Sequence, residues 1–350
     1  MKILVTGNMG YIGPSVVNQL RASYPGSTLV GFDTGYFGNC ITSTEMLPEC
    51  RVDIQYFGDI RQFPKDILGG VDAVVHLAGI SNDPIGNRFE EVTLDINYRA
   101  SIELAKKSKE ARVKPFVFAS SCSMYGSADD SARTEKSPLN PLTAYAKSKA
   151  LTERDLEPLA DEGFKVTSLR FSTACGWSDR LRLDLVLNDF VAGAVTSKRI
   201  TILSDGTPWR PLINVKDMAR AIDWAISREA GNGGKFLAVN VGSDGWNCQV
   251  RDLAEGVAKV IPGVDISMNQ NAQPDKRSYR VNFDLFRKLA PGHQPKFDLI
   301  TSIRELKEGL EAMEFKDEDF RNSKYIRLNT LTQLQNKGLL NQNLEWVYKK

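Results

Sequence analysis

Residues 2–13 read KILVTGNMGYIG, a short apolar run that passes directly into three glycines, Gly7, Gly10 and Gly13, at G-x-x-G-x-x-G spacing. The apolar run predicts a strand, and the residues from Tyr11 to Ser23 predict a helix. Where a strand turns sharply into a helix, the amide groups and the positive helix end can bind phosphate, and glycine keeps side chains out of the way. The stretch therefore predicts a dinucleotide-binding loop, although a plain strand-to-helix turn can carry the same glycines.

Two aspartates follow the next predicted strands. Asp33 ends the strand Thr28–Asp33, twenty positions after Gly13, where a carboxylate can accept hydrogen bonds from the ribose hydroxyls of the cofactor. Because its charge would repel a 2′-phosphate, Asp33 favours NAD over NADP. Asp59 and Ile60 follow the third strand, where a side chain can reach the adenine, and a solvated turn aspartate is the alternative.

Short apolar runs alternate with longer amphipathic segments through the first half, as a parallel sheet with crossover helices requires. The predicted strands are Lys2–Thr6, Thr28–Asp33, Ile54–Phe57, Ala73–His76, Phe116–Ala119 and Val166–Leu169, and the later apolar segments Leu212–Val215 and Phe236–Val241 predict two more. The main predicted helices are Tyr11–Ser23, Phe89–Ala111 and Ala144–Glu162. We therefore expect an α/β fold, a Rossmann doubly wound parallel sheet with a smaller α+β substrate domain.

The expected division of the chain is discontinuous. Residues 1–172, together with about 209–245, are predicted to form the NAD-binding domain, and residues 173–208 and 246–324 a second, smaller domain. Residues 325–350 have apolar residues at helical spacing and are interpreted as a C-terminal packing arm without chemistry.

The composition excludes several classes of function. Lys plus Arg number 45 against 43 Asp plus Glu, which argues against a nucleic-acid or anionic membrane partner. No apolar run reaches the roughly 18 residues that a membrane helix needs, and the first residues lack a signal-peptide pattern, so a cytoplasmic protein is expected. Five scattered cysteines and two histidines indicate neither a disulfide framework, a metal site nor a histidine-based catalytic triad.

A tyrosine and a lysine lie four residues apart in the predicted helix that begins at Ala144. This spacing puts Tyr145 and Lys149 on one face, so the ammonium group and a positive nicotinamide ring could lower the pKa of the phenol toward the range of a general base. A Ser-rich segment, residues 120–123, ends the preceding strand at the sheet edge where open α/β folds bind ligands. An ordinary amphipathic helix with a surface tyrosine and lysine is the alternative.

Together these motifs resemble the extended short-chain dehydrogenases/reductases, and specifically the NAD-dependent epimerase/dehydratase group. The resemblance spans nearly the whole chain and rests on the glycine loop, the run His76-Leu77-Ala78-Gly79, Asn97, the Ser-rich strand end and the Tyr145/Lys149 pair. It implies Ser121, Tyr145 and Lys149 as catalytic residues. It also implies that NAD is bound by Gly7, Gly10, Tyr11, Ile12, Gly13, Asp33, Asp59, Ile60, Leu77, Ala78, Gly79, Asn97, Tyr145 and Lys149.

The same resemblance implies a nucleotide-diphosphate sugar as substrate, with residues 173–208 and 246–324 as the nucleotide-sugar-binding domain. Residues 204–217 resemble the family's substrate loop, whose arginine, here Arg210, binds the diphosphate, and an arginine fork suits that task. A surface salt bridge is the alternative for Arg210. Arg277 is a second basic candidate, and Ser121, Ser123 and Thr173 complete the expected substrate site. Thr173 stands where many relatives have asparagine, which leaves the identity of the sugar open.

Departures from the family pattern narrow the reaction. Dehydratases carry an Asp-Glu pair after the catalytic hydroxyl residue and decarboxylases a glutamate, whereas this chain has Cys122-Ser123. We therefore expect epimerisation, at C4, in which Tyr145 takes a hydroxyl proton while hydride passes to retained NAD and returns to the other face. A 4-ketoreductase or dehydrogenase that releases its cofactor is the alternative, and a non-catalytic dinucleotide sensor is a third hypothesis. The resemblance also implies a homodimer that pairs the two long helices, although both could simply cover the sheet.

Overall fold

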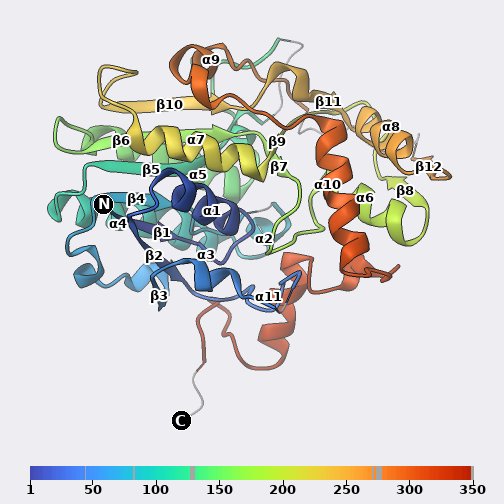
Figure 1. Cartoon of the computed structure of the whole chain (residues 1–350), viewed down its shortest axis with the longest axis horizontal. Helices are drawn as coiled ribbons and strands as arrows, with labels where there is room; N and C mark the ends of the chain where they lie inside the picture. Colours follow the sequence, from blue (N-terminus) through green and yellow to red (C-terminus); the bar gives the residue numbers. More distant parts are fainter. Residues whose placement is uncertain (44, 82, 127–130, 270–271, 273–277, 348–350) are drawn as a thin grey trace.

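Seven parallel strands form the central sheet of the computed structural model, which describes residues 1–43, 45–81, 83–126, 131–269, 272 and 278–347. Their order is β10-β6-β5-β4-β1-β2-β3, so the chain reverses direction across the sheet between β1 and β4 (Figure 1). The strands are β1 (Lys2–Thr6), β2 (Thr28–Asp33), β3 (Ile54–Phe57), β4 (Ala73–His76), β5 (Pro115–Ser121), β6 (Lys165–Phe171) and β10 (Phe236–Val241). The predicted doubly wound parallel sheet is confirmed.

Helices cover both faces of this sheet. Successive side chains of a strand point to opposite faces, and in β1 the neighbours Val5 and Leu4 belong to two different hydrophobic clusters. The cluster of Val5 includes α1 (Gly13–Ser23) and α7 (Val215–Ser227), which lie in front of the sheet in Figure 1. The cluster of Leu4 includes α4 (Ala100–Glu110) on the other face.

The predicted helix over residues 89–111 is interrupted by one wider turn. It consists of α3 (Glu90–Leu94), a π-helical turn (Asp95–Arg99) and α4. Such π-turns occur often at functional sites, and this one carries Asn97. The predicted helix that begins at Ala144 is α5 (Ala144–Leu156), which is shorter than expected because a 3₁₀ turn follows it.

The later part of the chain builds a separate layer at the right of Figure 1. It contains a three-stranded sheet, β11-β9-β7, and a two-stranded sheet, β12-β8. These strands are β7 (Thr173–Cys175), β8 (Arg199–Ile202), β9 (Trp209–Asn214), β11 (Asn247–Gln249) and β12 (Asp265–Met268), and the helices around them are α6 (Val186–Thr196), α8 (Val250–Val260) and α10 (Leu299–Ala312). Of the two later strands predicted from apolar segments, β10 joins the central sheet, whereas β9 pairs with β7 and β11.

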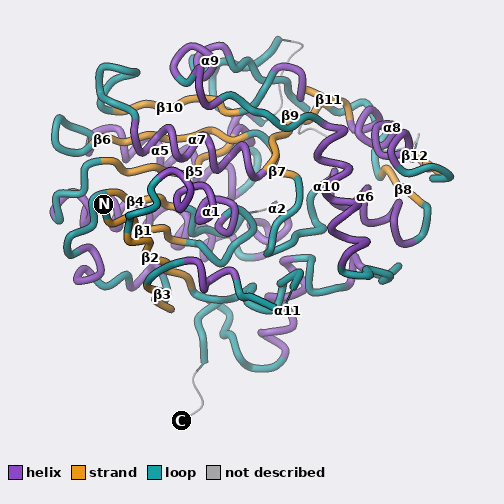
Figure 2. The backbone as a smooth tube through the Cα atoms, in the orientation of Figure 1, coloured by secondary structure: helices purple, strands orange, loops and turns teal. Residues whose placement is uncertain are grey.

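The last described residues return to the edge of the central sheet. Helix α11 (Arg327–Asn336) is followed by a loop that reaches the residues after β2 and β3, near the bottom of the view in Figure 2. Two short helices, α2 (Asp83–Arg88) and α9 (Asp284–Leu289), are the remaining α-helices of the described residues. Among the described residues, none of the helices combines the length and apolar character that crossing a membrane demands.

Candidate active site

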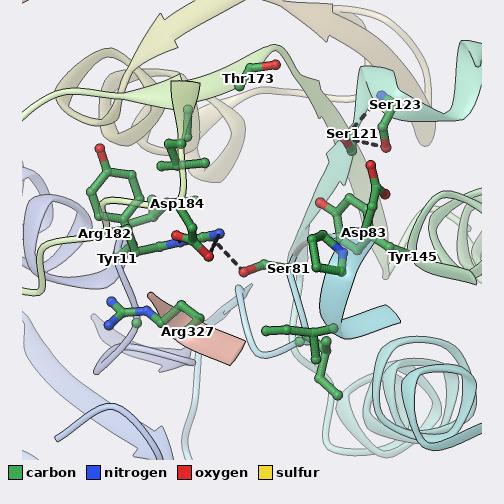
Figure 3. A pocket seen from close by; sticks show the side chains of 18 of the residues that line it. Tyr11, Ser81, Asp83, Ser121, Ser123, Tyr145, Thr173, Arg182, Asp184 and Arg327 are labelled. Atoms are coloured by element: carbon green, nitrogen blue, oxygen red, sulfur yellow. Dashed lines mark hydrogen bonds and ion pairs between the residues drawn. The ribbon is translucent and has the colours of Figure 1, made fainter. Parts of the chain in front are cut away.

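A cavity of about 940 Å³ lies at the carboxyl ends of the central strands, between the sheet and the later part of the chain. This is the usual position and size for a small-molecule site in an open α/β fold. Its walls come from the glycine loop, the ends of β2, β4 and β5, helix α5, strand β7 and the start of α11. Figure 3 shows side chains from the glycine loop, β5, α5, β7 and α11 around one space.

The glycine loop folds as a tight turn that leaves room for a ligand. Gly7 has φ +76°, and a Cβ there would lie 2.5 Å from the backbone N of Ala78. A Cβ on Gly13 would lie 2.1 Å from the carbonyl oxygen of Asn8. Gly10 lines the cavity, where a Cβ would meet only the carbonyl oxygen of Gly7 at 3.1 Å. The close backbone contacts therefore require glycine at Gly7 and Gly13, whereas a Cβ on Gly10 would narrow the cavity.

The first turn of α1 has no side-chain cap. Ile12, at its N-cap position, offers no hydrogen-bond acceptor to the first amide groups, and Ile12 and Tyr11 both line the cavity. The Tyr11 phenol donates to the carbonyl oxygen of Gly176 (2.6 Å), which fixes the loop against the later part of the chain. An uncapped helix end beside glycine fits a diphosphate group.

Asp33 joins the glycine loop to the end of β2. Its carboxylate accepts hydrogen bonds from the backbone N of Met9 (3.0 Å) and of Gly35 (2.8 Å), and it lines the cavity. Burial raises the pKa of Asp33, and these two hydrogen bonds act in the opposite direction. The position predicted to contact ribose hydroxyls is therefore occupied by a carboxylate that two backbone hydrogen bonds hold in place.

Asp59 and Ile60 also line the cavity, but the carboxylate of Asp59 is already paired. Its two oxygens accept from Nε of Arg61 at 3.0 Å each, and one also accepts from the Arg61 backbone N at 2.9 Å. The contact with adenine expected for Asp59 stays a prediction, and Arg61 is the competitor for that carboxylate.

The loop after β4 forms the next part of the wall, through Leu77, Ala78 and Gly79. Asn97, expected in the same site, lies behind this loop and does not line the cavity. Its side-chain oxygen accepts from the backbone N of Ile80 (2.7 Å), and its amide group donates to the Ile80 carbonyl oxygen (2.8 Å). Asn97 therefore positions the loop from behind.

Ser121, Tyr145 and Lys149 come together on one wall, and all three line the cavity. Ser121 ends β5 and donates to the Ser123 hydroxyl (2.9 Å). Thr143 caps α5 by accepting from the backbone N of Ala146 (3.2 Å), which fixes the start of the helix beside Tyr145. Nζ of Lys149 lies 5.7 Å from the centre of the Tyr145 ring and donates to the carbonyl oxygen of Ala119 (2.7 Å).

Burial dominates the acid-base properties of this wall. It lowers the pKa of Lys149 to about 8, so the ammonium form still prevails at neutral pH. Burial also raises the pKa of Tyr145, and the adjacent Ser121 hydroxyl works against this rise. The pKa of His76 falls to about 3, mainly by burial and also through the charge of Lys149, so His76 is a neutral structural residue.

The cavity also contains further residues that were expected to bind substrate. Ser123, Thr173 and Arg210 all line it, and Nη1 of Arg210 donates to the carbonyl oxygen of Trp209 (2.9 Å). Arg277 lies outside the described residues.

Several polar residues of the cavity were missed in the sequence. Asp83 accepts a hydrogen bond from the Thr143 hydroxyl (2.7 Å) and faces the Ser121 wall in Figure 3. Its position just after the loop that follows β4 could have indicated that Asp83 lies in the cavity. Arg182 donates to the Ser81 hydroxyl (2.9 Å) and pairs with Asp184 (2.9 Å), and no sequence pattern singled out either residue. Arg327 of α11 lines the cavity as well.

The described residues offer no cluster of histidine, cysteine and carboxylate side chains that could hold a metal ion. Cys122 and Cys175 are fully buried in the hydrophobic clusters and are not among the residues that line the cavity. Burial raises the pKa of both thiols.

Comparison with known proteins agrees with this geometry. The model of the NAD dependent epimerase/dehydratase family matches residues 3–242. A UDP-glucose 4-epimerase of Neisseria gonorrhoeae is 30% identical over 273 residues, which cover 69% of this chain and 78% of that protein. UDP-glucuronic acid decarboxylase 6 of Arabidopsis thaliana is 25% identical over 332 residues, 92% of this chain and 89% of that protein.

Among solved structures, MoeE5 in complex with UDP-glucuronic acid and NAD has a similar fold. The TM-score is 0.75 at 26% identity, and the match covers 89% of this chain and 99% of that one.

Proposed function

Because the chain belongs to the NAD-dependent epimerase/dehydratase family, and is thus an NAD-dependent enzyme of the extended short-chain dehydrogenase/reductase type, we propose that it epimerises a nucleotide-diphosphate sugar. The proposal places the inversion at C4. One observation carries it: Ser121, Tyr145 and Lys149 lie on the wall of a single cavity that also contains the glycine loop and Arg210.

The proposed roles follow from these positions. When bound, NAD supplies the hydride acceptor for the ring carbon and afterwards the hydride donor to the other face of the keto-sugar. Tyr145 takes the proton of the sugar hydroxyl and later returns it, and the Ser121 hydroxyl holds the same oxygen. Lys149 stabilises the phenolate by its positive charge. Arg210 and Thr173 hold the diphosphate end while the sugar turns.

The reaction type rests on the groups beside the catalytic serine. Cys122 is buried away from the cavity, and Ser123 presents a hydroxyl rather than a carboxylate. Asp83 is a carboxylate that faces this wall from another element. Elimination of water across C5 and C6 requires an acid and a base, so Asp83 alone does not replace the pair that dehydratases use. Epimerisation needs only the reversible proton transfer that Tyr145 supplies.

The test is product analysis without added cofactor. The purified protein is incubated with UDP-, dTDP- and GDP-sugars, and NMR is used to look for the C4 diastereomer. We expect turnover with the NAD that the protein retains. The Tyr145→Phe variant should lower kcat by about 10²–10⁴-fold, whereas Tyr98→Phe, a control at a tyrosine bonded to Asp155 outside the cavity, should not. A pentose, a 4-keto-6-deoxy sugar or stoichiometric NADH consumption would contradict epimerisation.

We also propose a homodimer formed through α4 and α5. Both helices cover the same face of the sheet and contact one another, and the expected pairing would place two such helices from each copy around a twofold axis. Light scattering at micromolar concentration should give twice the 38.9 kDa chain mass. A monomer at every concentration would contradict the dimer.

A further inference from the structure

The C-terminal arm, residues 325–347, is bound to the two loops that follow β2 and β3. Nε1 of Trp346 donates to the carbonyl oxygen of Thr34 (2.7 Å), and Nη1 of Arg61 donates to the carbonyl oxygen of Asn343 (2.9 Å). The Tyr36 phenol donates to the carbonyl oxygen of Leu344. These loops begin at Asp33 and Asp59, so the arm closes over the end of the cavity where the adenosine is expected.

The arm also supplies part of the cavity wall. Ile326, Arg327 and Leu331 line it, and all three lie beyond residue 242, where the family match ends. The sequence interpretation of this segment as packing without chemistry therefore omits its contact with the cofactor space.

Arg327 is a buried cation that forms no ion pair with any residue that the structure describes. Its side chain is 2% exposed, and Nη2 donates to the carbonyl oxygen of Arg180 (2.9 Å). Its guanidinium carbon lies 4.5 Å from the centre of the Phe37 ring. Within the described part of the chain, Nη1 has no hydrogen-bond partner and no carboxylate lies within ion-pair distance.

The neighbouring buried arginines, unlike Arg327, form ion pairs. Arg180 pairs with Glu49 at 2.6 Å, and Arg182 pairs with Asp184 at 2.9 Å. Burial lowers the pKa of Arg327 to about 10, so it stays charged at neutral pH. A buried charge is costly unless a counter-charge is nearby. Asp184 acts on Arg327 electrostatically without forming an ion pair with it, and an anionic ligand in the adjoining cavity would supply a direct partner.

The position of Arg327 indicates which ligand it would contact. Phe37, on which it lies, is four residues beyond Asp33, and in Figure 3 the side chain extends from the arm toward the blue amino-terminal part of the chain. Helix α11 begins at Arg327 without a side-chain cap, so its positive end adds to the same field.

We propose that the C-terminal arm is part of the dinucleotide site and that Arg327 binds the diphosphate of NAD. This inference rests on NAD being the cofactor and is independent of the sugar chemistry. The arm then has to loosen before NAD leaves, which would keep the cofactor on the enzyme between turnovers.

Calorimetric titration of nucleotide-free protein tests the ligand assignment. Hydrogen bonds to charged groups contribute about 1.5–3 kcal/mol, so Arg327→Met should weaken binding of NAD and ADP-ribose by about 10–100-fold. Adenosine, which lacks phosphate, and UDP should bind as to the wild type, and Arg327→Lys should recover part of the loss. Weaker UDP binding with unchanged NAD binding would assign Arg327 to the substrate diphosphate and overturn the proposal.

Thermal unfolding separates binding from packing. Because Arg327→Met removes an unpaired buried cation, the Tm of the nucleotide-free variant should not fall, while the rise in Tm caused by NAD should shrink. A lower Tm with an unchanged NAD-induced rise would show a structural role only and overturn the proposal.

A second variant tests the arm even if Arg327→Met does not fold. Trp346→Phe removes the donor to Thr34 and keeps most of the packing. NAD release, followed by stopped-flow fluorescence, should be faster in this variant, and an unchanged release rate would overturn the role of the arm.

Discussion

Asp83 lies beside Tyr145 on the same wall of the cavity, and its negative charge adds to the effect of burial in raising the pKa of that phenol. The Thr143 hydroxyl donates to Asp83 and also caps the helix that carries Tyr145. One threonine thus fixes both groups. The electrostatic coupling has a consequence for the pH dependence of the enzyme, because a general base acts only when it is deprotonated.

Asp83→Asn should move the acidic limb of kcat/KM to lower pH. Removing the negative charge favours the phenolate, so the pKa of Tyr145 falls. The measurement is the pH profile of kcat/KM from pH 5 to 10 in both proteins. Asp205→Asn is a suitable control because Asp205 is exposed and does not line the cavity. A profile that does not move would show that Asp83 has no electrostatic influence on the base.

The lowered pKa of Lys149 predicts that the stability of the folded protein rises with pH. Its pKa is about 8 in the folded protein and about 10.4 in an unfolded chain. Between these values the unfolded chain binds more protons, so the folded state gains stability as the pH rises. From pH 7 to 9.5 the gain from this group should be about 2 kcal/mol.

Urea unfolding of nucleotide-free wild type and Lys149→Met at both pH values measures this effect. The difference in the free energy of unfolding between the two proteins should change by that amount, with the wild type gaining relative to the variant as the pH rises. A constant difference would mean that burial does not disfavour the ammonium form.

The fold was largely readable in the sequence because its signals are local. The strand β1 and the glycines after it specify a strand, a turn and a helix through steric rules, and β2 and β10 have the predicted bounds. The placement of β9 could not be predicted, because the short apolar segment Leu212–Val215 fits either sheet. Only its pairing with β7 and β11 decides which one it joins.

The residues of the candidate site also fall into two groups, those that local sequence spacing predicts and those that only the tertiary fold brings to the cavity. Tyr145 and Lys149 are one helical turn apart, so their proximity follows from spacing alone. Arg327 reaches the cavity only because residues 325–347 fold back over the sheet edge, a contact between positions roughly 300 residues apart. Asp83 was missed for a different reason. The family pattern concerns carboxylates directly after Ser121, whereas Asp83 begins α2, in the segment that follows the neighbouring strand β4.

Asp33 should control the choice between NAD and NADP. Asp33→Asn removes the charge that repels a 2′-phosphate and weakens the charge-assisted hydrogen bonds to ribose hydroxyls. We expect NAD to bind about tenfold or more weakly and the ratio of NADP to NAD affinity to rise. Calorimetric titration with both cofactors gives the ratio.

Asp53→Asn serves as the control. Asp53 accepts a hydrogen bond from the backbone N of Leu29, which lies in β2 as Asp33 does, but Asp53 pairs with Arg21 and does not line the cavity. An unchanged ratio in Asp33→Asn would place the ribose elsewhere.

Gly13 should matter for the stability of the fold, and Gly10 for the binding of NAD. In Gly13→Ala the new Cβ would lie 2.1 Å from the carbonyl oxygen of Asn8, so the backbone has to move, and the free energy of unfolding should fall by about 1–3 kcal/mol without NAD. In Gly10→Ala the Cβ meets only the carbonyl oxygen of Gly7 at 3.1 Å and otherwise enters the cavity. This variant should keep most of its stability and lose NAD affinity. Urea unfolding of both nucleotide-free variants, followed by NAD titration, separates the two effects. If Gly10→Ala bound NAD as the wild type does, the diphosphate would not lie against this loop.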